Sequence, residues 1–298
     1  MDAEAGVLSS PGQPRSALRG VVRDHWPLLV GLLLLAVPTI VSLGHQTWST
    51  EAGAHGPIVL ATGLWLLSHN RIDLTAGRRQ HGLALLAPLI LALPLYAFGR
   101  AYDFISLEVG ALYLVFLVAL AQMAGVAELR RNLFPLFYLA FVIPPPGWVI
   151  TYITAPLQTF VSYVAVSALQ PLGYPIARSG VSLTIAQYQL LVEDACAGMN
   201  SITGLVAISL FYIYMIHRAS WRYALLLVAL IIPVAVFVNI LRVIALILLT
   251  YYYGDAVAQG FMHVTTGLVL FVFAIGAIFV IDRALQKLFG AGRTEQAA

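Results

Sequence analysis

Apolar residues gather along the chain in runs of about 20 residues, separated by short polar segments. Helical runs of this length match the thickness of the bilayer's hydrocarbon core, because a helix rises about 1.5 Å per residue. A span in hydrocarbon must also satisfy its own backbone hydrogen bonds. The pattern therefore predicts an all-α polytopic membrane protein with about eight transmembrane helices. The runs cover residues 26–44, 54–70, 82–99, 105–128, 133–155, 196–216, 223–250 and 263–282.

Composition agrees with lipid as the solvent. Hydrophobic residues make up 60% of the 298 positions and charged residues only 10%, whereas a soluble domain carries about 25% charged residues. The lipid bilayer is thus the first expected partner, and the net charge of +3 gives no reason to expect nucleic acid binding. The oligomeric state is not determined by these features.

Arginine and lysine alternate between the polar segments, which predicts orientation by the positive-inside rule. Basic residues precede the first run and follow the second, fourth, sixth and eighth runs, while the other segments hold only Arg100 and Arg178. We therefore expect both termini in the cytoplasm. The predicted organisation is a cytoplasmic leader at 1–25, one transmembrane catalytic domain at 26–284 and a cytoplasmic tail at 285–298. The alternating basic residues are Arg15, Arg19, Arg23, Arg71, Arg78, Arg79, Arg130, Arg131, Arg218, Arg222, Arg283, Lys287 and Arg293.

The stretch after residue 133 breaks the regular spacing. Pro144, Pro145 and Pro146 stand in a row, and successive prolines cannot continue a helix. A second full crossing by 148–172 would reverse the charge alternation, so we expect an interfacial or re-entrant helix there, on the outer side. Residues 174–192 alternate between apolar and polar and predict a short extracytoplasmic hairpin before the sixth span.

Three uncommon residues reach the same predicted outer face on three different spans. Cys196 is the only cysteine and opens the sixth span, Arg242 lies toward the outer end of the seventh, and His263 opens the eighth. A cysteine nucleophile needs a positive charge or a base beside it, which arginine and histidine supply. Taken singly, each has a simpler explanation: an inert thiol, an arginine extending to headgroups, or an interfacial histidine. Asn200 shares the cysteine's helix face, and Asn239 shares that of Arg242.

At these residues the sequence resembles the exosortase and archaeosortase family. The resemblance rests on three blocks, taken in order: Val192 to Ile202, Val238 to Val243 and His263 to Gly267. Ala54 to Ile58 and Gly180 belong to it as well.

The resemblance implies a membrane-embedded cysteine transpeptidase or peptidase without a cofactor or metal. Such enzymes cleave C-terminal sorting signals, composed of a short motif, a hydrophobic helix and a basic tail, from membrane-anchored protein substrates. It implies catalytic roles for Cys196, Arg242 and His263 at the outer face of the cytoplasmic (inner) membrane. Asp194, Asn200 and Asn239 are candidates for binding or orienting the substrate, and Asp194 is equally suited to cap the sixth span. Ala197 replaces a serine common in the family, and asparagine at 200 replaces a basic or bulky residue, so the substrate motif stays open.

Two other classes remain open at this point. A transport subunit would bind a solute with Arg242 and Asp194, but the first five runs carry almost no intramembrane charge. A scaffold for exopolysaccharide assembly or export would need no catalytic thiol. A metalloprotease fits poorly, because no His-Glu-x-x-His spacing is present.

Overall fold

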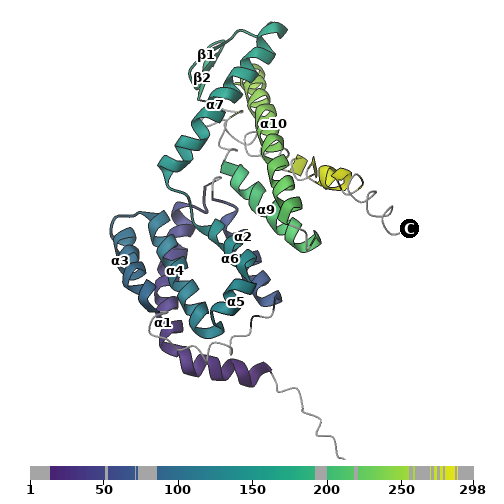
Figure 1. The fold of residues 1–298 in the computed structure, drawn as a ribbon. Coiled ribbons are helices and arrows are strands. Elements are labelled where there is room, and N and C mark those ends of the chain that lie inside the picture. Colours follow the sequence, from purple (N-terminus) through teal and green to yellow (C-terminus); the bar gives the residue numbers. More distant parts are fainter. Residues whose placement is uncertain are drawn as a thin grey trace, which may run out of the picture. The chain divides into compact units, whose positions relative to one another are not determined.

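The computed structural model describes residues 14–50, 53–70, 72, 86–191, 200–217, 221–254, 258, 269, 272–273, 276–277, 279–285 and 287. The chain divides into two compact units (Figure 1). Unit 1 comprises Met1–Leu43 and Leu64–Ile143, and unit 2 comprises Gly44–Gly63 and Pro144–Ala298.

Unit 1 is built from helices whose ends follow from local sequence. It contains most of α1 (Pro14–Gln46), which bends at His25, and the C-terminal end of α2 (Gly56–His69). α3 (Ala87–Ala101) packs against α4 (Ile105–Ala124). α4 stops at Gly125, whose φ of 85° leaves the helical region, so the fourth span ends earlier than the predicted run. The remaining elements are α5 (Val126–Arg131), α6 (Leu133–Leu139) and η3 (Ala140–Val142).

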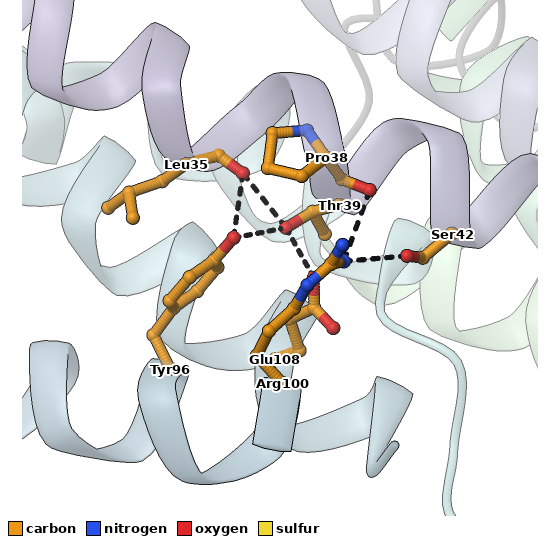
Figure 2. A network of polar contacts seen from close by, with 7 residues as sticks. All are labelled: Leu35, Pro38, Thr39, Ser42, Tyr96, Arg100 and Glu108. Carbon is orange, nitrogen blue, oxygen red and sulfur yellow. Dashed lines mark hydrogen bonds and ion pairs between the residues drawn. The ribbon is translucent and has the colours of Figure 1, made fainter. Parts of the chain in front are cut away.

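A buried polar network joins α1, α3 and α4 (Figure 2). Glu108 Oε1 accepts hydrogen bonds from Thr39 Oγ1 at 2.7 Å and from Arg100 Nη1 at 3.0 Å. Arg100 Nη1 also donates to Ser42 Oγ at 2.7 Å, and Tyr96 Oη donates to the Leu35 carbonyl oxygen at 3.0 Å. Side chains from three helices thus satisfy one another inside unit 1.

The network shows a carboxylate inside the fourth span. Glu108 has 3% of its side chain exposed, while its partner Arg100 keeps 43% exposed. Burial of a carboxylate is costly unless it is paired and hydrogen-bonded, and the arginine and the threonine meet both conditions. The sequence predicts almost no intramembrane charge in the first five runs. The buried carboxylate of Glu108 corrects that prediction. The charge pattern predicts the outer face for the segments that this network joins.

Unit 2 places a small sheet against two long helices. α7 (Gly147–Leu169) continues into η4 (Gln170–Leu172) and the sheet, which precedes α9 (Asn200–His217) and α10 (Trp221–Tyr253). α10 packs against α7, α9 and the third strand (Figure 1). The core of this unit comprises Val161, Ala165, Leu169, Ile176, Leu183, Ile185, Leu190, Val243, Leu246 and Ile247.

The predicted hairpin is a sheet of three antiparallel strands rather than two. β1 (Ile176–Ser179), β2 (Ser182–Ile185) and β3 (Tyr188–Leu191) lie in the order β1-β2-β3. Two-residue turns join them, and each begins with a left-handed residue, Gly180 at φ 63° and Ala186 at φ 51°. Alternation along β2 turns Leu183 and Ile185 inward to the core.

The helices only partly follow the predicted spans. Four helices of the described chain are long and apolar enough to cross a membrane: Arg23–Gln46, Ile105–Ala124, Gly147–Leu172 and Ile232–Tyr253. The predicted fifth run at 133–155 is wrong as one helix. Its first helical part ends at Val142, and α7 begins after the three prolines, because proline lacks an amide hydrogen and keeps the preceding residue out of the α region. α7 is continuous, as a full crossing requires.

We expect Arg100→Ala to destabilise unit 1 by about 3 kcal/mol, because it leaves the buried Glu108 carboxylate without its cation. The thermal unfolding midpoint of the purified protein in detergent should fall by several degrees. Arg131→Ala is the matched control, since its pair with Glu128 has the same 3.0 Å length but an arginine 66% exposed. That variant should lose less than about 1 kcal/mol. Equal shifts of the unfolding midpoint in the two variants would show that the network stabilises unit 1 no more than an exposed ion pair does.

Candidate active site

The predicted site residues divide between described and undescribed parts of the chain. Asp194, Cys196 and His263 lie outside the described residues. Asn200 is the first residue of α9, and its backbone alone is described. Asn239 and Arg242 both lie in α10 and are the members of the predicted site whose side-chain burial the structure shows.

Asn239 and Arg242 interrupt an apolar buried stripe on α10. The stripe repeats at intervals of three and four residues, which is the spacing of one helix face. The two polar side chains lie in its middle, with 4% and 5% of their surface exposed. The predicted shared face of this pair is thus confirmed. The stripe consists of Ala235, Val238, Asn239, Arg242, Val243, Leu246, Ile247 and Thr250.

Burial changes the interpretation of Arg242. An arginine that merely extends to lipid headgroups would keep its guanidinium at the surface, whereas this residue is 5% exposed. A cation in a membrane helix is costly and normally faces protein or a water-filled cavity. Arg242 therefore brings a permanent positive charge to the protein interior, beside the amide of Asn239.

The helices α9 and α10 form a helical hairpin, which sets the level of Asn200. Only three residues separate His217 from Trp221, and the helices pack against each other, so they run antiparallel. α9 runs from Asn200 to its last residue, His217. The same number of residues leads from Trp221, the first residue of α10, to Val238. Since both helices have the same rise per residue, the start of α9 is level with Val238 and Asn239.

A cluster of tyrosines attaches the sheet to the end of α10. The hydroxyl oxygens of Tyr174 and Tyr252 are 3.0 Å apart, and the Tyr174 ring meets that of Tyr251 edge to face with centroids 5.4 Å apart. Gly254 ends α10 at φ 83°, and a methyl group there would lie 3.3 Å from the Tyr188 hydroxyl. The strand that leads to the cysteine segment is thus held against α10. These tyrosines are not among the predicted site residues, although the run Tyr251–Tyr253 is a visible signal in the sequence.

Other polar groups of the described chain form no comparable site. Asp282 is fully buried and accepts a hydrogen bond from Tyr212 at 3.0 Å, so it joins α9 to the C-terminal segment. Among the described residues, no group of three or more His, Cys, Asp or Glu side chains could hold a metal ion.

A family model described as transmembrane exosortase (Exosortase_EpsH) matches residues 47–280, which include every block on which the resemblance rests. The chain belongs to the transmembrane exosortase family. No curated protein and no solved structure matches it. Exosortase membership, together with the span-length helices, makes this a membrane protein with a sortase-like processing role, and it implies a cysteine transpeptidase. α1 lies wholly outside the matched residues, although it supplies Thr39 and Ser42 to the network of unit 1.

We expect Tyr174→Ala to loosen the sheet from α10, because both the ring contact and the hydroxyl pair are lost, at a cost of about 1 kcal/mol. Cleavage by trypsin after Arg178, an exposed residue of β1, should become about fivefold faster in detergent, since a locally opened segment is cut in proportion to its population. Tyr253→Ala removes a neighbouring tyrosine that is 68% exposed and should leave the rate unchanged. Identical trypsin cleavage rates in both variants would contradict the attachment of the sheet to α10.

Proposed function

We propose that this exosortase family member is a membrane-embedded cysteine protease or transpeptidase that cleaves C-terminal sorting signals of exported proteins. Cleavage takes place at the outer face of the cytoplasmic membrane through a thioester intermediate. Cys196, Arg242 and His263 are the proposed catalytic residues, and Asp194, Asn200 and Asn239 bind or orient the substrate. The enzyme is a multi-pass protein of the cell inner membrane with both termini in the cytoplasm. The organisation proposed from sequence is kept: a leader at 1–25, a catalytic domain at 26–284 and a tail at 285–298.

The observation that carries the proposal is the burial of Arg242 on the helix that both flanks of Cys196 contact. Cys196 follows β3 by five residues and precedes Asn200 by four. β3 and α9 each pack against α10. Asn200 is level with Val238 and Asn239, and the four residues from Cys196 to Asn200 are long enough for the cysteine to reach the level of Arg242. A permanent cation at that level favours the thiolate form of the cysteine.

The sheet supports an outer location for this level. Open strand edges cannot lie in lipid, and the sheet packs on Val243, Leu246 and Ile247. α10 is about 50 Å long, and about 30 Å of hydrocarbon uses about 20 of its 33 residues. Counted from Trp221 on the cytoplasmic side, the outer boundary of the hydrocarbon falls near Leu241. Hydropathy alone would centre the span on Ile232–Tyr253 and put Arg242 midway, but the sheet packing makes the boundary near Leu241 the better placement.

α7 is the proposed fifth crossing, in place of the predicted interfacial or re-entrant helix. The segment Leu133–Val142 is only about 15 Å long and cannot span. If α7 crosses instead, the number of crossings before Cys196 stays the same and the charge alternation is preserved. Its C-terminal half packs against the sheet, which places Leu169 on the outer side.

The chemistry follows from this arrangement. Cys196 sulfur attacks the scissile carbonyl carbon while His263 takes the thiol proton, and Arg242 stabilises the negative charge that develops on the carbonyl oxygen. Collapse of the tetrahedral intermediate breaks the C–N bond, His263 protonates the leaving amine, and an acyl thioester remains on the enzyme. An amine acceptor or water then attacks the thioester and regenerates the thiol. A substrate anchored by its own C-terminal helix would present its motif at this level.

A non-catalytic transport or assembly subunit of an exopolysaccharide or export system is the alternative. The buried ion pair in unit 1 gives it no specific support, because Glu108 is satisfied by Arg100 and Thr39 rather than directed at a solute pathway.

The decisive test is co-expression with a membrane protein that carries a C-terminal motif, hydrophobic helix and basic tail. We expect Cys196→Ala, Arg242→Ala and His263→Ala each to lower cleavage at least 100-fold at equal membrane abundance, because each removes one part of the reaction. Immunoblots of precursor and product measure the effect.

Arg242→Met separates catalysis from folding. Replacement of a buried charge by an apolar side chain of similar volume is often neutral or stabilising, so this variant should accumulate normally and remain inactive. Cleavage that survives Cys196→Ala would end the thiol mechanism and favour the non-catalytic alternative.

Cysteine labelling tests the crossing by α7. Trp148→Cys and Leu172→Cys, each in a Cys196→Ala background, occupy positions that are both 72% exposed. A membrane-impermeant maleimide should label Cys at 172 in intact spheroplasts and Cys at 148 only after the membrane is opened. Labelling of both from outside would restore the interfacial placement.

A further inference from the structure

A close contact brings a histidine to the helix that follows the proposed nucleophile. His55 is half-buried, and its carbonyl oxygen accepts a hydrogen bond from the Val59 amide at 3.0 Å, so the residue sits at the start of α2. A methyl group on Gly204 of α9 would lie 3.0 Å from His55 Cβ, 3.4 Å from its Cγ and 3.7 Å from Nδ1. Glycine at 204 therefore lets His55 lie directly against α9.

The described residues just before His55 are linked by short-range backbone hydrogen bonds. The amides of Thr50, Gly53 and Gly56 donate in succession to the carbonyl oxygens of Thr47, Thr50 and Gly53. A side chain at Gly53 would overlap Thr47, and one at Gly56 would overlap the indole of Trp48. Turns closed by consecutive hydrogen bonds, with no space around their glycines, hold a defined conformation. The loop thus presents His55 to α9 from a fixed position.

The contacted face of α9 is the one that leads to the cysteine. Gly204 follows Asn200 by four residues, and Asn200 follows Cys196 by four. Residues four apart on a helix lie one turn above each other on nearly the same face. His55 therefore packs one turn after Asn200, on the face of α9 where Asn200 lies.

We propose that His55 is a positioning residue for Cys196: through its contact with Gly204, it fixes the start of α9, which follows Cys196 by four residues, relative to Arg242 on α10. This inference rests on the proposed function and adds to it the residue directly before α2, far from the three motif blocks in sequence. His55 does not touch the reacting atoms in this role. Its effect on catalysis passes through the placement of α9 relative to the cation on α10.

The lone cysteine allows a test that needs no substrate. The rate of iodoacetamide alkylation of the purified protein in detergent reports Cys196 alone, and the rate follows the thiolate population. We expect His55→Ala and Gly204→Ala to slow alkylation at pH 7 by about three- to tenfold and to move the midpoint of its pH profile upward. The physical reason is that the thiolate loses the nearby charge of Arg242. Arg242→Met should move the midpoint in the same direction.

Matched controls separate positioning from general damage. His69→Ala removes the histidine at the other end of α2, and Gly110→Ala adds a methyl group to a helical glycine with nothing within 4 Å; both should match the wild type. His55→Gln keeps the Cγ position and a polar end, both of which His55→Ala loses, so it should restore the alkylation rate to within about twofold of wild type.

The outcomes distinguish this inference from the proposed function. Substrate cleavage that needs Cys196, together with wild-type alkylation in His55→Ala and Gly204→Ala, would overturn the positioning role alone. Cleavage that persists in Cys196→Ala would overturn the proposed function itself. A slower alkylation rate in His55→Ala with an unshifted pH midpoint would also count against positioning relative to Arg242.

Discussion

Hydrocarbon offers no hydrogen-bonding partner, and this constraint decides where each part of unit 2 can lie. Within the described part of the chain the three-stranded sheet does not close into a barrel, and our proposal therefore places it at the membrane surface. Its core residues pack on the C-terminal halves of α7 and α10, which ties those halves to the same level. The proposed site, its outer location and the crossing by α7 all depend on this one piece of packing.

α10 is the common support of the proposed site. One face of this helix packs with the sheet through Val243, Leu246 and Ile247, and the same buried stripe carries Asn239 and Arg242. The tyrosine cluster at its C-terminal end and the helical hairpin with α9 attach the segments on either side of Cys196 to this helix. A polar pair inside an apolar stripe weakens packing locally, which is a common cost at functional sites.

Unit 1 also contains a buried charge, but there the charge holds helices together. Its buried carboxylate and half-exposed arginine satisfy each other and join three helices through Thr39, Ser42 and Tyr96. The result is a closed network that holds α1 against residues of the family core. In unit 2, by contrast, the buried arginine lies on the helix that both flanks of the proposed nucleophile contact. Burial of charge thus serves cohesion in one unit and, in our proposal, reactivity in the other.

The sequence by itself determined the membrane class, the family and the shared face of Asn239 and Arg242, because hydropathy, motif order and helical periodicity are local properties of the chain. It did not determine that α7 packs against the sheet, that the hairpin has a third strand, or that His55 lies against Gly204. These features depend on contacts between segments far apart in the chain: α7 with the sheet, β3 with α10, and the loop before α2 with α9. Periodicity carries no information about such pairings, and only the tertiary structure decides them.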